Sequence, residues 1–409
     1  MYEKLAYALV PSGYKANKLY SFVGGDLTFT RTSTATRINK DGYIEFVPTG
    51  VPRLNYPLVN GVPSSTLELL LEPARINFQV YSEDFSNAAW SKIGSTIDTD
   101  PIIAPDGNLA YAMRETTATS EHRVSDAYAS FDGSSSYTFS VFAKHNGARL
   151  LNLFSGTSSR FAANANFDLV NGVVYSSPTG TATIEKYPNG WYRCSVTGVS
   201  ASSGSSTLVI RHKDESLNTS YAGDLNEATY LWGAQLEEGY LTSYIPTFDS
   251  TASRIEEGAI SGTGNFNDYS GVLFAEIQSQ NDIPDGNAYI ALSDNSVSNM
   301  INIRYTTDGL LQIHNNGTSL SNRIYGEDYD LTQNLKIAVQ YGTTTGDYKV
   351  FINGVEKTVF GTFSASAMSG LSTVDLTYPT HTLPFLGAIK QVLVFNEALT
   401  DSELEKLTT

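Results

Sequence analysis

Apolar and polar residues alternate in short runs along most of the chain, and turn-forming residues separate the runs. Residues 136–143 (Ser-Tyr-Thr-Phe-Ser-Val-Phe-Ala) show the period of two expected of a strand that is buried on one face. Asn171-Gly172 and Asn353-Gly354 each lie between such runs, and Asn-Gly tolerates the positive φ angles of hairpin turns. The pattern therefore predicts an all-β chain built from antiparallel β-sandwich (jelly-roll) domains.

Changes in this pattern divide the chain into four segments. Residues 1–70 are short strands cut by Pro and Gly, too broken for a core of their own, and we expect an extended assembly segment that lies along a neighbour or pairs with other chains. Its deletion is expected to leave the rest folded. Residues 71–250 and 265–409 carry the regular alternation of two sandwiches, while residues 251–264, rich in Ser, Thr and Gly, are interpreted as a linker.

The chain is expected to end in a short helix. Thr400 is a good N-cap residue, and Glu403 stands at the position that completes a capping box. Leu399 and Leu404 have the spacing of a hydrophobic staple across the same helix start.

Composition narrows the classes of partner. The 409 residues are 41% hydrophobic and 11% aromatic, which is enough to bury substantial cores. A formal net charge of −16 repels phosphate backbones, which argues against nucleic acid, and no apolar run approaches the roughly 20 residues that cross a bilayer, so membrane insertion is not expected. The single cysteine, Cys194, excludes an intramolecular disulfide and a multi-thiolate zinc site.

Three ordered motifs resemble the carbohydrate-binding-module-like jelly rolls of bacteriophage tail and fibre proteins. The first is Arg75-Ile76-Asn77-Phe78 with residues 81–90, and the others are residues 187–193 and residues 230–237 with 244–247. The resemblance covers about residues 70–250. It implies a jelly roll and a place on a virus particle.

The rest of the chain shows two further resemblances. Residues 348–354 and 387–404 resemble concanavalin A-like, laminin-G-type sandwiches, which also occur in phage fibres. The motifs at residues 31–36 and 50–53 resemble the head of such virion proteins. The first of the two covers about residues 265–409 and specifies a fold better than a ligand.

Together the resemblances imply a non-enzymatic bacteriophage virion structural protein, a fibre, spike or decoration, that adheres to host-surface glycans through many weak contacts. They imply a homo-oligomer, usually a trimer in such fibres, whose residues 1–70 contact other virion proteins. Residues 1–25 show no signal peptide, so we expect synthesis in the host cytoplasm and a final location in the virion.

Aromatic residues are the candidates for contacts with sugar rings. Tyr240 and Tyr244 are predicted rim positions of the jelly roll, and Trp90 follows a turn. Aromatic side chains also dominate sandwich cores, so a core position remains the alternative for each of them.

Calcium is the ion that the resemblance implies, because modules of this type often carry it as a structural ion; no other cofactor is required. Glu83, Asp84 and Glu237, near the predicted ends of the jelly roll, carry the oxygen ligands that Ca²⁺ prefers. Turn and N-cap roles are the alternative for these carboxylates.

A glycan-degrading enzyme, a depolymerase or polysaccharide lyase that uses the C-terminal sandwich, is the alternative function. Gln312-Ile313-His314, followed by Tyr341 and Tyr348, resembles the base and acid of such lyases. No arginine-rich strand that would neutralise a uronate is visible, and the paired-acid motif of glycoside hydrolases on this fold is absent.

Overall fold

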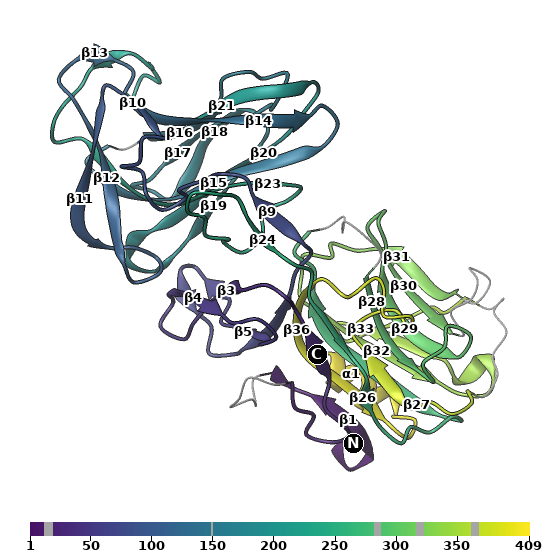
Figure 1. The fold of residues 1–409 in the computed structure, drawn as a ribbon. Coiled ribbons are helices and arrows are strands. Elements are labelled where there is room, and N and C mark those ends of the chain that lie inside the picture. Colours follow the sequence, from purple (N-terminus) through teal and green to yellow (C-terminus); the bar gives the residue numbers. More distant parts are fainter. Residues whose placement is uncertain (12–18, 149, 282–287, 316–322, 361–367) are drawn as a thin grey trace.

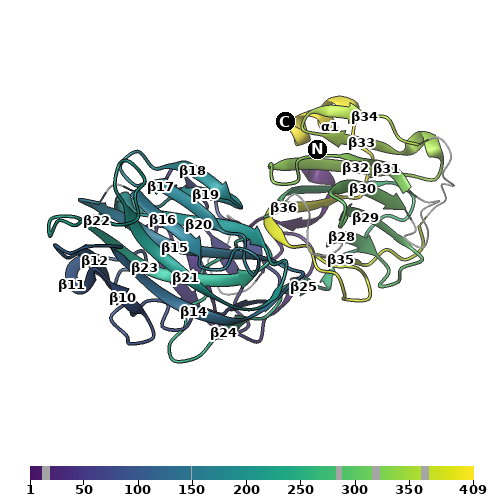
Figure 2. The ribbon, with the colours of Figure 1, turned by 90° about the horizontal axis from the view of Figure 1, so that it is seen from above.

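The chain forms two lobes joined at a waist, and both chain termini lie on the C-terminal lobe (Figure 1). The computed structural model describes residues 1–11, 19–148, 150–281, 288–315, 323–360 and 368–409. Each lobe is built from antiparallel sheets, and the lobes stand side by side when they are seen from above (Figure 2). The predicted all-β fold with two antiparallel sandwiches is confirmed.

Two six-stranded sheets make the first sandwich. In spatial order, one consists of β10 (Ser91–Ile93), β14 (Arg123–Asp132), β21 (Ser203–Lys213), β16 (Leu150–Ser155), β17 (Asn164–Asp168) and β18 (Val173–Thr179). The other consists of β11 (Ser95–Ile103), β12 (Leu109–Glu115), β23 (Ala228–Glu238), β15 (Ser136–Asn146), β20 (Tyr192–Val199) and β19 (Thr181–Lys186).

Alternating side chains fill the space between these sheets. Tyr137, Phe139 and Val141 on β15 point into the core and meet residues of the opposite sheet, such as Leu151. The predicted hairpin at Asn171-Gly172 joins β17 to β18 and is confirmed, with Gly172 at φ 66°. The local pattern thus determines which face of each strand is buried.

The second sandwich pairs an eight-stranded with a six-stranded sheet. The larger contains β34 (Val355–Lys357), β33 (Lys349–Ile352), β32 (Leu335–Tyr341), β27 (Gly271–Gln278), β36 (Gly387–Phe395), β8 (Glu68–Leu71) and β5 (Arg53–Asn55), with β1 (Leu5–Leu9) also on β36. The smaller contains β26 (Gly262–Thr263), β35 (Thr373–Asp375), β28 (Ala288–Ser293), β29 (Met300–Tyr305), β30 (Leu310–Asn315) and β31 (Arg323–Asp328).

Strands of the predicted assembly segment, residues 1–70, belong to this second sandwich. β1 pairs with β36, and β5 and β8 extend the same sheet beyond β36. Tyr7, Leu9 and Leu54 therefore lie in its core. The segment thus lies along the C-terminal sandwich of the same chain and, at Ile44, against the first sandwich. We therefore expect its deletion to destabilise the C-terminal sandwich, in place of the expectation that the sandwiches fold without residues 1–70. Contact of the segment with other virion proteins stays a prediction.

Residues 251–264, interpreted as a linker, are paired along much of their length. They contain β24 (Ala252–Arg254), which pairs with β9 (Arg75–Asn77), and β25 (Gly258–Ile260), which pairs with β2 (Thr28–Thr30). Three further two-stranded ribbons are β3 (Ala35–Ile38) with β4 (Ile44–Val47), β6 (Leu58–Val59) with β7 (Val62–Pro63), and β13 (Thr119–Ser120) with β22 (Tyr221–Ala222). Backbone hydrogen bonds between β9 and β24, and between β2 and β25, therefore hold the segments that connect the two lobes.

The predicted C-terminal helix is confirmed as α1 (Asp401–Thr408). The Thr400 hydroxyl accepts a hydrogen bond from Glu403 N (3.3 Å), and the Glu403 carboxylate accepts one from Thr400 N (2.9 Å). Leu404 and Leu407 cover the outer face of the larger sheet. Short 3₁₀ turns occur at η1 (Tyr2–Lys4), η3 (Pro188–Gly190) and η5 (Thr345–Asp347). In the described ranges, no helix has the length and apolarity needed to cross a membrane.

Deleting residues 1–66, which removes β1 and β5 but keeps β8, should destabilise the C-terminal sandwich by roughly 10 kcal/mol, because the five core side chains Tyr7, Leu9, Leu19, Leu27 and Leu54 are lost at about 1.5–3 kcal/mol each. Hydrogen–deuterium exchange should show faster exchange in β27 and β36, while β15 and β21 stay protected. Unchanged protection of β27 and β36 would show that the N-terminal strands are dispensable.

Candidate functional site: the cleft at the waist

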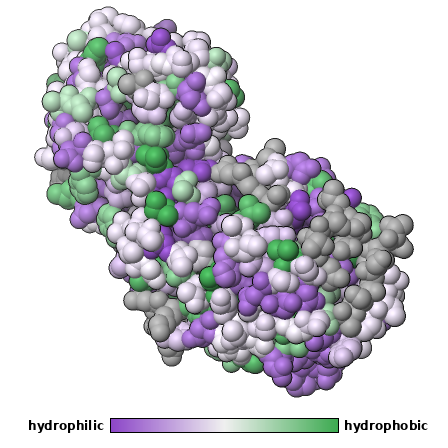
Figure 3. All heavy atoms as spheres, turned by 45° about the vertical axis from the view of Figure 1, so that its right-hand side comes forward, coloured by the Kyte–Doolittle hydropathy of each residue, from purple (hydrophilic) through white to green (hydrophobic). Residues whose placement is uncertain are grey.

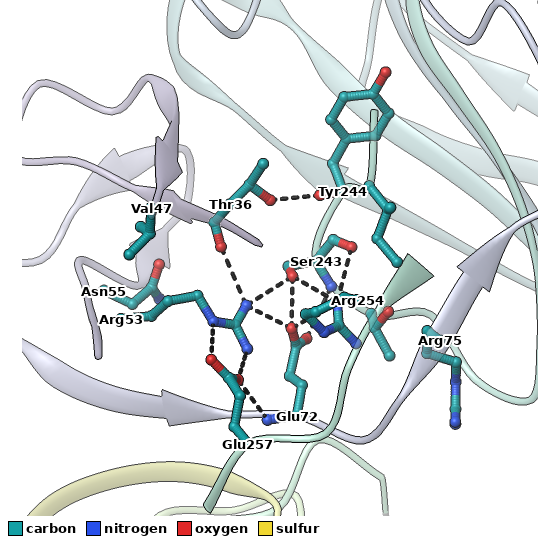
Figure 4. Close-up of polar contacts among 12 residues, drawn as sticks. Thr36, Val47, Arg53, Asn55, Glu72, Arg75, Ser243, Tyr244, Arg254 and Glu257 are labelled. Atoms are coloured by element: carbon teal, nitrogen blue, oxygen red, sulfur yellow. Dashed lines mark hydrogen bonds and ion pairs between the residues drawn. The ribbon is translucent and has the colours of Figure 1, made fainter. Parts of the chain in front are cut away.

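A buried cluster of charged side chains holds the waist together, and Arg53 lies at its centre (Figure 4). Arg53 is fully buried, and its Nε donates to Glu257 Oε1 (2.9 Å). Its Nη1 donates to Glu72 Oε2 (2.6 Å) and to the carbonyl of Thr36 (3.1 Å). One guanidinium thus joins the N-terminal segment, β8 and the crossing to the second sandwich.

Two further arginines complete the cluster. Arg31 Nη1 donates to Glu257 Oε1 (2.7 Å), and Arg31 Nη2 donates to the carbonyl of Pro48 (2.6 Å). Arg254 Nη1 lies 3.0 Å from Glu72 Oε2. These side chains are almost completely buried, so the pairs are not screened by solvent. Three arginines therefore surround two glutamates.

Burial alone would raise the pKa of Glu72, but Arg254 and Arg53 hold that pKa well below its usual range. Ser243 N (2.8 Å) and Gln280 Nε2 (2.7 Å) also donate to this carboxylate. Glu72 is therefore ionised, and it connects the end of the jelly roll at Ser243 to the second sandwich at Gln280.

A cleft of about 390 Å³ opens beside this cluster. The N-terminal segment, the first sandwich and the second sandwich all contribute to its walls. Its polar lining residues are Thr36, Arg37, Asn55, Glu68, Glu72, Glu185, Tyr187, Arg193, Thr242, Ser243, Tyr244, Gln278, Ser279, Gln280 and Thr332. In Figure 3 the surface around the waist is largely hydrophilic, with single apolar residues among the polar ones. The cleft thus offers many hydrogen-bonding groups.

One wall comes from the outer face of the β11–β19 sheet. Glu185 and Arg193 point outward because Ile184 and Cys194 beside them point into the core. Arg193 is buried; its Nη1 donates to the carbonyl of Thr242 (2.7 Å), and its guanidinium lies 5.1 Å from the Phe142 ring centre. The Glu185 residue keeps an exposed surface, but burial of its carboxyl group raises its pKa, against the effect of Arg193. A carboxylate and a guanidinium therefore face one opening.

The facing wall comes from the N-terminal segment and its sheet. Glu68 on β8 is buried and accepts a hydrogen bond from Asn55 Nδ2 (3.2 Å). Burial raises the pKa of Glu68. Arg37 on β3 forms an ion pair with Glu45 on β4 (2.7 Å), which fixes its side chain at the rim.

Aromatic rings form the base of the first wall. Phe142 packs against Tyr187 (ring centres 4.9 Å apart) and Trp232 (5.1 Å), and Trp232 packs against Tyr244 (4.5 Å). Ile44 of the N-terminal segment belongs to the same apolar cluster. The predicted glycan contact Tyr244 therefore lines the cleft, but its ring is 3% exposed and serves mainly as packing.

The other two glycan candidates lie elsewhere. Trp90 is buried in the core of the first sandwich, where its Nε1 donates to the carbonyl of Tyr81 (3.1 Å). Tyr240 is half-buried, and Arg75 lies 4.9 Å from its ring centre. Arg75 lines a separate groove of about 710 Å³ that does not include Tyr240. The structure does not bring these three aromatic residues together.

The calcium candidates are each engaged with the protein. Glu83 accepts from the Tyr244 hydroxyl (3.0 Å), and Asp84 accepts from Ser86 N (3.1 Å) in a local turn. Glu237 is buried and accepts from Thr242 N (3.0 Å). Within the part of the chain that the structure describes, no group of three His, Cys, Asp or Glu residues is arranged to hold a metal ion.

The lyase candidates occupy two different sheets. His314 on β30 is buried beside Gln312 Oε1 (3.1 Å), and burial, Arg304 and Arg323 lower its pKa to about 4. Tyr341 and Tyr348 lie in the core of the second sandwich. The structure does not place them in one cleft with His314.

Sequence reasoning did not single out Glu185 and Arg193 as site residues. The available signal is alternation: the charged residues occupy the outward positions of strands whose inward positions carry Ile184, Cys194 and Val196. Alternation identifies the face, but it does not show that another segment converts that face into a cleft.

The chain matches no protein-family model and no curated protein. The carbohydrate-binding module CBM40 of a Ruminococcus gnavus IT-sialidase bound to α2,3 sialyllactose is 15% identical, with a TM-score of 0.28 over 35% of this chain and 84% of that one. Domain 4 of the GH43 arabinanase AbnA from Geobacillus stearothermophilus is 19% identical (TM-score 0.29, 42% and 83% covered). Trypanosoma rangeli sialidase is 10% identical (TM-score 0.30, 99% and 96% covered). Likenesses at this level assign neither a family nor a ligand.

Replacing Arg53 by Met should cost about 3–5 kcal/mol in the free energy of unfolding, because it leaves Glu72 and Glu257 short of a buried partner. The matched control is Arg37→Met, which removes a partly exposed pair worth at most about 1 kcal/mol. Urea unfolding of both variants measures the difference. Equal losses in the two variants would show that the cluster does not hold the waist.

The free energy of unfolding should fall as pH rises from 4.5 to 7 through Glu83. Burial first, and then Asp106, raises its pKa to about 7, so the folded state holds a proton that the unfolded state has released in this window. The effect is on the order of 3 kcal/mol and should vanish in Glu83→Gln. The control is Glu356→Gln at an exposed position. The same pH dependence of the free energy of unfolding in wild type and Glu83→Gln would refute the assignment to Glu83.

Stabilisation by millimolar Ca²⁺ that is lost in Glu83→Gln would support the calcium expectation.

Proposed function

We propose that this chain is a non-enzymatic glycan-binding structural protein of a bacteriophage particle and that the cleft at the waist is its saccharide site. The observation that carries the proposal is the solvent-open Glu185 beside the buried Arg193 and Tyr187 in a cleft of about 390 Å³. Small-ligand sites have volumes of about 300–1,000 Å³.

The lining chemistry suits sugar hydroxyls. A hydroxyl both donates and accepts, so a cleft that binds several of them needs fixed acceptors and fixed donors. Glu185, Glu68 and Gln280 Oε1 provide acceptors, while Arg193, whose Nε has no hydrogen-bond partner among the described residues, provides donors. Carboxylates whose pKa is raised by their surroundings gain from the new donors that a sugar brings.

The charge cluster supports the proposal by keeping the walls in place. Glu72 belongs to both the cluster and the cleft lining, so the walls cannot separate without breaking buried ion pairs. A cleft that is already formed loses little entropy when it binds. Several copies displayed on one particle would multiply weak contacts into firm adhesion.

The place on a virion rests on the resemblances of the sequence motifs to phage fibre proteins. The N-terminal segment supports an assembly role in one further respect: it keeps exposed apolar side chains. Tyr2 is 62% exposed, and Val59 and Val62 on the β6–β7 ribbon are 62% and 64% exposed. These positions are available to other virion proteins or other copies of the chain.

Glu185→Gln should weaken binding to extracted host-surface polysaccharide roughly tenfold, because it removes a charged acceptor and keeps the side-chain shape. The control is Glu356→Gln, an exposed change on the other sandwich. Binding by surface plasmon resonance and release of reducing or unsaturated ends are measured together. Equal affinities in the two variants would show that the cleft is not the saccharide site. Release of reducing or unsaturated ends would favour the depolymerase or lyase alternative.

A further inference from the structure

The outer face of the smaller sheet in the second sandwich carries polar side chains in two lateral rows. Ile301, Ile303 and Ile313 point into the core, so their neighbours on β29 and β30 point to the opposite face. Strand register aligns Asp375, Ala291, Asn302, His314 and Arg323 in one row, and Tyr289, Arg304, Gln312 and Gly326 in the next.

The floor of this face contains polar atoms without partners. Asn302 is 1% exposed, and neither its amide nitrogen nor its amide oxygen has a hydrogen-bond partner. Arg304 Nε in the neighbouring row is also buried without a partner. Buried polar groups are nearly always paired, so the unpaired amide and guanidinium nitrogen are positions at which water or a ligand supplies the missing partners.

The rim of the face is positively charged. Arg304 and Arg323 are partly exposed, and among the described residues neither forms an ion pair with a carboxylate. Arg304 lies 5.6 Å from the Tyr289 ring centre and Arg323 lies 5.3 Å from the Phe360 ring centre. The nearby Asp308 is exposed and instead accepts from the Thr306 hydroxyl. The aromatic rings orient both guanidinium groups, and Asp308, whose pKa both arginines help to lower, offsets their two positive charges only in part.

Gly326, which has no side chain, lies between the arginines of the rim and the polar residues of the floor. A Cβ at Gly326 would lie 3.2 Å from Arg323 Cδ and 3.4 Å from Gln312 Cγ, so the glycine keeps the space between these residues open. Gln312 is hydrogen-bonded to His314, and His314 lies beside Asn302 in the register. A ligand that reaches the arginines from solvent therefore meets a polar floor.

We propose that this face is a second saccharide site, specific for sugars that carry a carboxylate. The planar guanidinium groups of Arg304 and Arg323 match a carboxylate in two-bond geometry. Asn302, Gln312 and His314 add donors and acceptors but no further acid, and they suit the ring hydroxyls. The site lies on the second sandwich, it shares no residue with the cleft at the waist, and it does not depend on the function proposed for that cleft.

The test uses the full chain, with galacturonate and mannuronate hexamers as acidic probes and maltohexaose as the neutral match, measured by titration calorimetry. Wild type should bind at least one acidic hexamer more tightly than maltohexaose. Arg323→Gln should lose about tenfold or more of that affinity, because a charge-assisted contact is removed. The matched control is Lys406→Gln, which removes one exposed cation from α1 of the same lobe. Asn302→Ala should weaken binding several-fold.

The variants separate this site from the cleft. Glu185→Gln should leave the affinity for the acidic hexamers unchanged, and Arg323→Gln should leave binding at the cleft unchanged. The proposal is overturned if wild type binds neither acidic hexamer better than maltohexaose, or if Arg323→Gln behaves like Lys406→Gln. Melting temperatures check that each variant is folded; should Asn302→Ala fail to fold, the partly exposed Arg323 decides the result alone.

Discussion

The architecture depends on the buried ion pairs of Arg53 with Glu72 and Glu257. Removing charged groups from water is costly, and only their mutual attraction and full hydrogen bonding offset that cost. The partners are 19 and 204 residues away along the chain from Arg53, so the cluster forms only when the N-terminal segment, β8 and the crossing at β24 and β25 are all in place. A single set of contacts therefore couples the two lobes.

This coupling gives the N-terminal segment two structural roles. Its strands β1 and β5 complete the larger sheet of the second sandwich, while Ile44 covers the aromatic outer face of the first. An isolated sandwich would expose the rings of Phe142 and Trp232 on that face. In the whole chain both rings are buried, and the cleft is the space that remains beside them between the segment and the sheet. The packing of the N-terminal segment thus completes the second sandwich and forms the cleft at the same time.

Local patterns in the sequence were sufficient for the elements and insufficient for their partners. The Asn-Gly hairpins and the Thr400 capping box were predictable because a few neighbouring residues determine them. The pairing of β1 with β36 was not, because register between strands so distant in sequence leaves no local periodicity. Arg31 and Arg53 belong to recognisable motifs, yet their role depends on Glu257, more than 200 residues further along the chain. Glu185 likewise could not be identified as a site residue from the sequence, because segments distant along the chain complete the cleft around it.

The net charge of −16 does not determine the charge of the ligands. Exposed charges are screened beyond about 8 Å at physiological ionic strength, so long-range repulsion acts mainly on densely charged polymers such as nucleic acids. A sugar with one carboxylate per ring responds instead to the groups that it touches. On the outer face of the second sandwich those groups are Arg304 and Arg323, and in the cleft they include Glu68 and Glu185. An acidic chain can therefore hold a site whose local charge is positive.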